Sequence, residues 1–190
     1  MKIILGSSSP FRKQVIEDHG FVVETMSPDV DELAIRTEDF YDLPLTLARA
    51  KSDSLRSQVS EPAILITIDT VAAFDGNLRE RPLTEKEAYE WLREYSTGNP
   101  VETISGVVVI NTGTNKRAEG TDKTKVYFKE MPESVIQDFI AQGNPLRLGG
   151  GFGIQHPIMA PYIDRIEGER ESVIGMPITL VKKLIAEVQE

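Results

Sequence analysis

A loop of small hydroxyl residues near the start of the chain could bind an anion. Residues 2–5 form a short apolar run, and one glycine and three serines follow it. Ser9 suits the N-cap of a helix, and Pro10 suits its first turn. The first amides of a helix lack intrahelical partners and, together with the helix dipole, attract anions. We therefore interpret Ser7, Ser9 and Arg12 as candidate phosphate ligands. The alternative is an ordinary capped helix with a solvated arginine.

A single carboxylate interrupts the most apolar stretch of the chain. Residues 63–74 read AILITIDTVAAF, a run of β-branched and apolar side chains typical of a buried strand. A carboxylate in such a strand is costly unless it is paired, hydrogen-bonded or bound to a metal. We interpret Asp69 as a group that binds Mg²⁺ or orients a water. The alternative is that Asp69 faces solvent at a strand end or caps a turn.

Three further charged features could join Asp69. An acidic run ending in Glu32 covers residues 29–32 and could supply oxygen ligands, although such runs are more often solvated surface. Lys51 falls in the middle of a predicted helix, on the same side as apolar positions. Arg81 precedes a proline, which favours an extended backbone there. Each cation taken alone could also be an ordinary surface charge.

A glycine-rich loop lies in the last third of the chain. Residues 149–153 contain four glycines, which allow a ligand to approach the backbone closely. Gln155 follows, and its amide could pair with the edge of a base. His156 has no histidine or cysteine partner at metal-ligand spacing, so we interpret it as structural.

The elements that must position these residues alternate irregularly. The patterns predict strands at 2–5, 21–25, 63–74 and 162–167, and a hairpin over 101–128 that turns near residues 113–115. They predict helices at 10–20, 43–59, 84–95, 132–143 and 177–188. Because strands and helices mix without strict alternation, we expect an α/β fold with a mixed sheet flanked by helices.

The composition limits the possible partners. The chain has 190 residues, which fits one domain or one domain with two lobes, and a net charge of -9, which disfavours binding to nucleic acid. It has no cysteine, so a disulfide framework and a thiolate metal site are excluded. The first residues are too short an apolar run for a signal peptide, and no stretch is apolar enough to span a membrane. We expect a cytoplasmic protein without membrane association.

Seven motifs taken in order resemble one family. They are SSSPFRKQVI, SPDVDE, LARAKSDSL, ILITIDTV, ERPLTEKEA, GGGFGIQ and VIGMP. Together they are similar to the Maf family of nucleoside triphosphate pyrophosphatases, over essentially the whole chain. The resemblance implies a single domain over residues 1–190, with a mixed twisted sheet and two lobes around a deep cleft. It also implies a homodimer that hydrolyses a nucleotide between the α and β phosphates.

The resemblance also implies residue roles. Asp69 would be the catalytic base. Ser7, Ser9, Arg12, Lys51 and Arg81 would bind the substrate, and Glu32 and Asp69 would hold Mg²⁺, or Mn²⁺ in its place. These roles agree with phosphoryl chemistry, which depends on positioning and charge stabilisation.

Three positions bear on the substrate. Thr70 and Gln155 match the branch of the family that resembles dTTP/UTP pyrophosphatases. Phe11 leans toward the 7-methyl-GTP branch, since an aromatic ring can stack on a methylated, cationic purine. Two positions against one favour dTTP, UTP and modified pyrimidine nucleotides. Arg81, which stands where the family usually has lysine, leaves its geometry open.

Other functions compete with this prediction. They are a 7-methyl-GTP pyrophosphatase of the same family, a non-catalytic nucleotide-binding regulator of cell division, and a nucleotidyltransferase. The regulator would bind nucleotide without releasing pyrophosphate, and the transferase would need an acceptor.

Overall fold

The computed structural model describes all 190 residues. They divide into two compact units. Unit 1 comprises Met1–Thr70, Ser105–Asp122 and Gly175–Glu190, and unit 2 comprises Val71–Ile104 and Lys123–Ile174.

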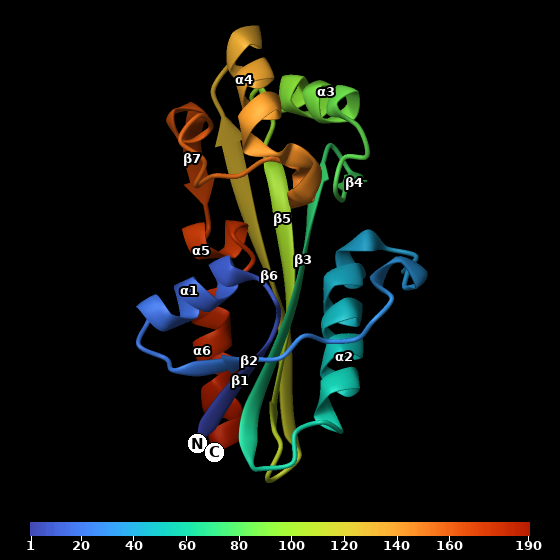
Figure 1. Cartoon of the computed structure of the whole chain (residues 1–190), viewed down its shortest axis with the longest axis vertical. Helices are drawn as coiled ribbons and strands as arrows, with labels where there is room; N and C mark the ends of the chain where they lie inside the picture. Colours follow the sequence, from blue (N-terminus) through green and yellow to red (C-terminus); the bar gives the residue numbers. More distant parts are fainter. The chain divides into compact units, whose positions relative to one another are not determined.

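The strands form a mixed seven-stranded sheet in the order β2-β1-β3-β5-β6-β7, with β4 paired to β3. β1 is parallel to both β2 and β3, whereas β3–β4 and β6–β7 are antiparallel. The bounds are β1 Lys2–Gly6, β2 Val23–Thr25, β3 Ala63–Phe74, β4 Asn77–Arg79, β5 Val101–Asn111, β6 Lys116–Phe128 and β7 Ile163–Glu167. The predicted α/β class, a mixed sheet with flanking helices, is confirmed (Figure 1).

The helices follow the sequence signals closely. Their bounds are α1 Pro10–Asp18, α2 Leu43–Arg56, α3 Glu85–Tyr95, α4 Glu133–Gly143, α5 Arg170–Val173 and α6 Ile178–Gln189, with short 3₁₀ turns between several elements. Only the single turn α5 and the short strand β4 lacked a predicted counterpart. Thr84 caps α3 by accepting from the Glu87 amide, as the capping-box pattern indicated.

In unit 1, helix α2 packs closely on the sheet. Ala48 of α2 belongs to an apolar cluster with Val108 and Ile110 of β5. Gly106 makes this approach feasible, because a Cβ there would lie 2.3 Å from the Leu45 Cα. On β3, the Thr67 hydroxyl donates to the Ala48 carbonyl at 2.7 Å. The odd-numbered positions near the middle of β3 therefore face α2.

Unit 2 has its own core, which is rich in aromatic rings. Tyr95, Phe128 and Phe152 lie within 6.0 Å of one another, measured between ring centroids. The Tyr95 hydroxyl donates to the Gly150 carbonyl at 2.9 Å. Gly150 and Gly151 both have positive φ, so the glycine-rich segment has a backbone that other residues rarely adopt. The aromatic core thus anchors this segment.

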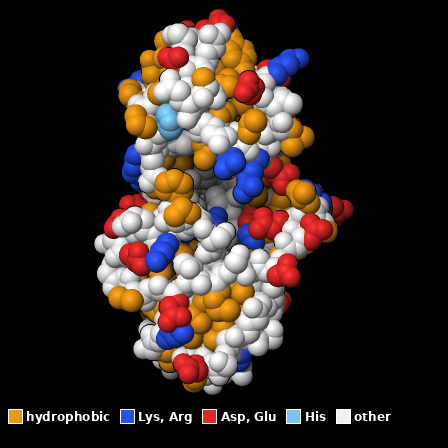
Figure 2. Space-filling model, viewed as in Figure 1, with side chains coloured by type: hydrophobic (Ala, Val, Ile, Leu, Met, Phe, Trp, Pro, Cys, Tyr) orange, Lys and Arg blue, Asp and Glu red, His pale blue; other side chains and the backbone are white.

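Acidic and basic side chains are interspersed over the face seen in Figure 2. No helix is both long enough and apolar enough to cross a membrane.

Candidate active site

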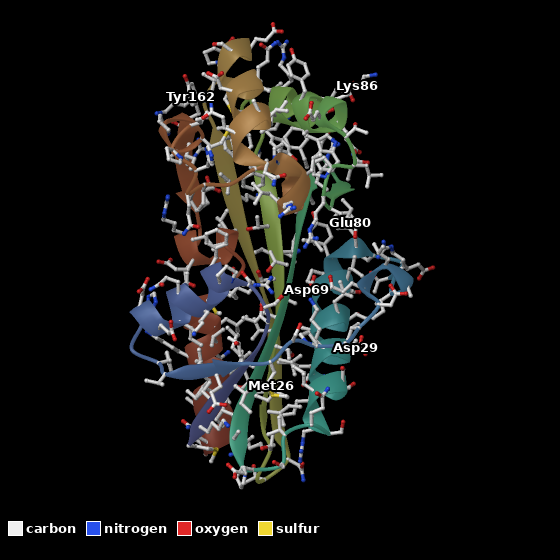
Figure 3. All side chains as sticks on the ribbon, in the orientation of Figure 1. Met26, Asp29, Asp69, Glu80, Lys86 and Tyr162 are labelled. Carbon is white, nitrogen blue, oxygen red and sulfur yellow. The ribbon has the colours of Figure 1, made fainter.

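The candidate site in unit 1 lies just past the end of strand β1. The register pairs Gly6, the last residue of β1, with Thr67 of β3. β3 continues beyond this pair, so Asp69 and Thr70 follow the point where the chain leaves β1 and turns into α1. Ligands of open α/β sheets bind at such carboxyl ends of parallel strands. Figure 3 labels Asp69 on β3.

The loop between β1 and α1 has the predicted capped geometry. The Ser7 hydroxyl accepts from the Ser9 amide at 3.2 Å, and the Ser9 hydroxyl accepts from the Arg12 amide at 3.4 Å. Each hydroxyl therefore keeps its own hydrogen available for donation to an anion. Pro10 occupies the first turn of the helix. The loop thus combines two hydroxyl donors with a helix N-terminus.

Lys51 joins the two carboxylates that were predicted to hold a metal. Its ammonium lies 2.5 Å from Asp69 Oδ1 and 2.8 Å from Glu32 Oε1. Lys51 is 5% exposed and Asp69 7%, whereas the Glu32 side chain is half exposed. The alternatives, a solvent-facing Asp69 and a Lys51 that is an ordinary surface charge, are therefore excluded. The two buried charges compensate each other.

Burial raises the pKa of Asp69, while the ammonium of Lys51 and the guanidinium of Arg12 oppose this rise. Burial also lowers the pKa of Arg12, and Asp69 and Glu32 oppose that shift. A carboxylate with a raised pKa is a better proton acceptor than an ordinary aspartate, which suits a general base.

The Thr70 side chain lies on the face of β3 opposite to that of Asp69. The Arg12 Nη1 donates to the Ile68 carbonyl at 3.0 Å, and its Nη2 donates to the Thr70 hydroxyl at 3.4 Å. The Thr70 hydroxyl also bonds the Ser105 hydroxyl of β5 at 2.8 Å. Alternation along the strand thus directs Asp69 toward α2 and Thr70 toward α1, which lie on opposite sides of β3 (Figure 1).

Asp69 and Glu32 are the two carboxylates that were predicted to hold Mg²⁺. No group of three histidine, cysteine or acidic side chains lies close enough to hold a metal ion. Asp69 and Glu32 instead form a pair about one ammonium. Mg²⁺ is commonly bound by one or two carboxylates together with substrate phosphates and waters. The two carboxylates fit that mode and do not fit an all-protein metal cage.

Several other predicted residues are more exposed than Lys51 and Asp69. Phe11, beside Arg12, is 54% exposed. Of the acidic run, only Glu32 reaches Lys51, while Asp31 caps a 3₁₀ turn by accepting from two amides. Arg81 and Gln155 are exposed residues of unit 2, so their roles at the site stay predictions.

His156 is structural, as expected. Its Nδ1 accepts from the Ile158 amide at 3.3 Å, and its ring packs edge-on against Phe139.

Comparison with known proteins identifies the family of the chain. The family model described as Maf-like protein matches residues 2–188. The chain belongs to this family. A 7-methyl-GTP pyrophosphatase of Dictyostelium discoideum is 40% identical over 99% of this chain and 98% of its own. Two dTTP/UTP pyrophosphatases are 31% and 33% identical, from Bdellovibrio bacteriovorus (97% of each chain) and Thermotoga petrophila (98% of this chain, 89% of its own).

The sequence analysis did not single out two residues of this Maf-like site. Ser105 holds the Thr70 hydroxyl, and Gly175 lies against Arg12 and Thr70. Ser105 shares strand β5 with Thr103, a second buried hydroxyl residue, so no signal in the sequence distinguishes it. Gly175 lies in the motif VIGMP, but its partners depend on tertiary structure.

Proposed function

We propose that this Maf-like protein is a nucleoside triphosphate pyrophosphatase. It hydrolyses the bond between the α and β phosphates and releases a nucleoside monophosphate and pyrophosphate. The observation that carries the proposal is the buried Lys51 ammonium held between Asp69 and Glu32, with Arg12 adjacent. Buried cations beside a carboxylate of raised pKa suit a polyanion that is attacked by water.

In the proposed reaction, a water molecule attacks the α phosphorus. Asp69 accepts a proton from that water as the new P–O bond forms. The bond between the α phosphorus and the bridging oxygen breaks, and the pyrophosphate takes the electron pair. Lys51, Arg12 and the amides at the start of α1 stabilise the negative charge on the phosphate oxygens.

Glu32 and Asp69 would hold Mg²⁺, or Mn²⁺ in its place. The metal would supply charge neutralisation of the phosphates and a template for their orientation. Ser7 and Ser9 would donate hydroxyl hydrogen bonds to phosphate oxygens. Arg81 stays a predicted substrate-binding residue.

For the substrate, the structure supports 7-methyl-GTP as the first candidate. The Thr70 hydroxyl already bonds Arg12 and Ser105, so it is poorly placed to select a base as well. Phe11 is exposed beside Arg12 and can stack on a cationic methylated purine. The relative named for 7-methyl-GTP is 40% identical, against 31% and 33% for those named for dTTP and UTP.

dTTP and UTP are the second candidate substrates. The observation in their favour is Gln155, whose exposed amide offers the paired donor and acceptor that a pyrimidine edge requires. A homodimer and a cytoplasmic location complete the proposal, and sedimentation of the purified protein would test the dimer.

The test is a pyrophosphate-release assay over ordinary and methylated nucleoside triphosphates with Mg²⁺ or Mn²⁺. We expect turnover of 7-methyl-GTP above that of dTTP and UTP. Asp69→Asn should lower kcat by about 10²-fold or more, the usual scale for a general base. Asp53→Asn is the matched control, because Asp53 is an exposed aspartate of unit 1 that pairs with Arg117. Saturable nucleotide binding without pyrophosphate release would instead favour a regulator.

A further inference from the structure

We infer that Ser105 is a positioning residue that acts through Thr70 to hold the Arg12 guanidinium in its phosphate-binding orientation. The inference rests on the proposed function, because that function makes Arg12 a ligand of the substrate phosphates. No family motif quoted above contains Ser105.

The contacts form a chain of three polar groups. A guanidinium has only donors, so the Thr70 hydroxyl oxygen accepts from Arg12 Nη2. The same oxygen lies 2.8 Å from the Ser105 hydroxyl. Whichever hydroxyl donates in that pair, the short bond restricts rotation of the Thr70 side chain. Ser105 therefore fixes the direction in which Thr70 presents its lone pair to Arg12.

The burial of the Ser105 hydroxyl costs free energy, and packing of the core does not explain why a serine stands there. Ser105 is 1% exposed within a largely apolar strand, and Thr70 is its one hydrogen-bond partner. A buried hydroxyl costs free energy unless it is bonded, and an alanine would fill this strand position without that requirement. A role in core packing alone therefore does not account for a serine here.

Two other groups confine the guanidinium around the Ser105–Thr70 pair. Arg12 Nη1 donates to the Ile68 carbonyl at 3.0 Å. Gly175 lies so close that a Cβ there would be 3.0 Å from both Arg12 Nη2 and the Thr70 hydroxyl oxygen. The guanidinium is thus set by a carbonyl, a hydroxyl and a glycine, and Ser105 controls the hydroxyl.

The experiment compares four forms of the full chain: wild type, Ser105→Ala, Ser105→Thr and the control Thr103→Val. Thr103 is a buried residue of the same strand whose hydroxyl donates to the Thr124 carbonyl, so its loss perturbs β5 without touching Arg12. Calorimetry measures the Kd for inorganic tripolyphosphate, and thermal unfolding checks that each variant is folded. This readout does not depend on catalysis.

We expect Ser105→Ala to weaken tripolyphosphate binding by about 3- to 10-fold, the range of one intramolecular hydrogen bond. Ser105→Thr, which keeps a hydroxyl, should recover most of the affinity, and Thr103→Val should bind like wild type. In an Arg12→Lys background, the Ser105→Ala change should have no further effect, because two residues that act through one contact are not additive.

Unchanged affinity in Ser105→Ala would overturn the inference, as would an equal loss in the Arg12→Lys background or equal weakening by Thr103→Val. Absence of tripolyphosphate binding by wild type would overturn it too. A wild-type protein that binds tripolyphosphate but hydrolyses no nucleoside triphosphate would contradict the proposed function alone, and the test of Ser105 would still stand.

Discussion

Replacement of Lys51 by methionine tests whether this lysine compensates the buried charge of Asp69. Methionine keeps much of the length and the apolar stem but removes the ammonium that contacts both carboxylates. Asp69 would then be a buried carboxylate with only Arg12 nearby in compensation, and Glu32 would repel its ionised form. Removal of one partner from a buried ion pair typically destabilises a protein by about 3–5 kcal/mol.

The structure also sets a limit on this loss. Asp69 can take up a proton when its charge becomes too costly, so the part of the penalty that comes from this charge cannot exceed the free energy of protonating an ordinary aspartate. With an ordinary pKa of about 3.9, that free energy is about 4 kcal/mol at about pH 7 and about 1.5 kcal/mol at about pH 5. The penalty for Lys51→Met should therefore shrink by up to about 2.5 kcal/mol between these pH values.

Proton binding by Asp69 determines the direction in which the stability of Lys51→Met changes with pH. Loss of Lys51 raises the pKa of Asp69 further in the folded state, so the folded protein binds more protons than the unfolded chain between the two pKa values. In that window the free energy of unfolding falls as pH rises, and the full stability returns below the unfolded pKa. The variant should consequently be less stable, relative to wild type, near neutral pH than in mild acid.

The assay is urea unfolding of metal-free wild type and Lys51→Met at several pH values. Lys183→Met is the matched control, since Lys183 is an exposed lysine of α6 that pairs with Glu187 at 3.7 Å. It should change stability by less than about 0.5 kcal/mol at every pH. A Lys51→Met penalty that is independent of pH, or no larger than that of Lys183→Met, would refute compensation of Asp69 by Lys51.

Two further changes test other features of unit 1. Gly175→Ala should weaken tripolyphosphate binding several-fold, because the new Cβ crowds Arg12, and should destabilise the protein by about 1–2 kcal/mol, because φ is +85°. Gly20→Ala is the control: Gly20 has the same φ with open space around it, so this variant should lose stability without losing binding. Equal binding by the two variants would contradict the prediction. Arg49 lowers the pKa of Glu119, so this carboxylate stabilises the fold above its unfolded pKa and loses that effect as pH falls through the lowered pKa. Glu119→Gln should lower the free energy of unfolding by about 1 kcal/mol at most, because the side chain is partly exposed. This difference from wild type should shrink below about pH 4, and a difference that grows in acid would contradict the prediction.

Most of the fold could be predicted from local sequence patterns. The apolar run at 63–74 and the capping box at Thr84 both mark their elements closely, because β-branched runs and caps act over a few residues. Strand β4 and the turn α5 lacked such signals, since each is too short to show periodicity. The predicted strand at 21–25 begins later, at Val23, because β1 pairs only with residues 23–25.

The candidate site could be predicted from the sequence only in part. Asp69 stood out because a carboxylate in an apolar strand violates the burial rule, and the structure supplies its partner, Lys51. The choice of Glu32 from the acidic run came from a family resemblance, since spacing alone could not show which of its three carboxylates reaches Lys51. Ser105 was missed because its function depends on an adjacent strand, which no local pattern encodes.

Asp69 and Thr70 contact different partners because of the geometry of strand β3. Adjacent residues of β3 face opposite sides of the sheet, so one meets Lys51 of α2 and the other meets Arg12 of α1. A shift of β3 by one residue would exchange the two and separate both from their partners at once. The parallel register of β1 with β3, which ends at Gly6 and Thr67, therefore determines the chemistry of the site as much as the identity of its charged residues does.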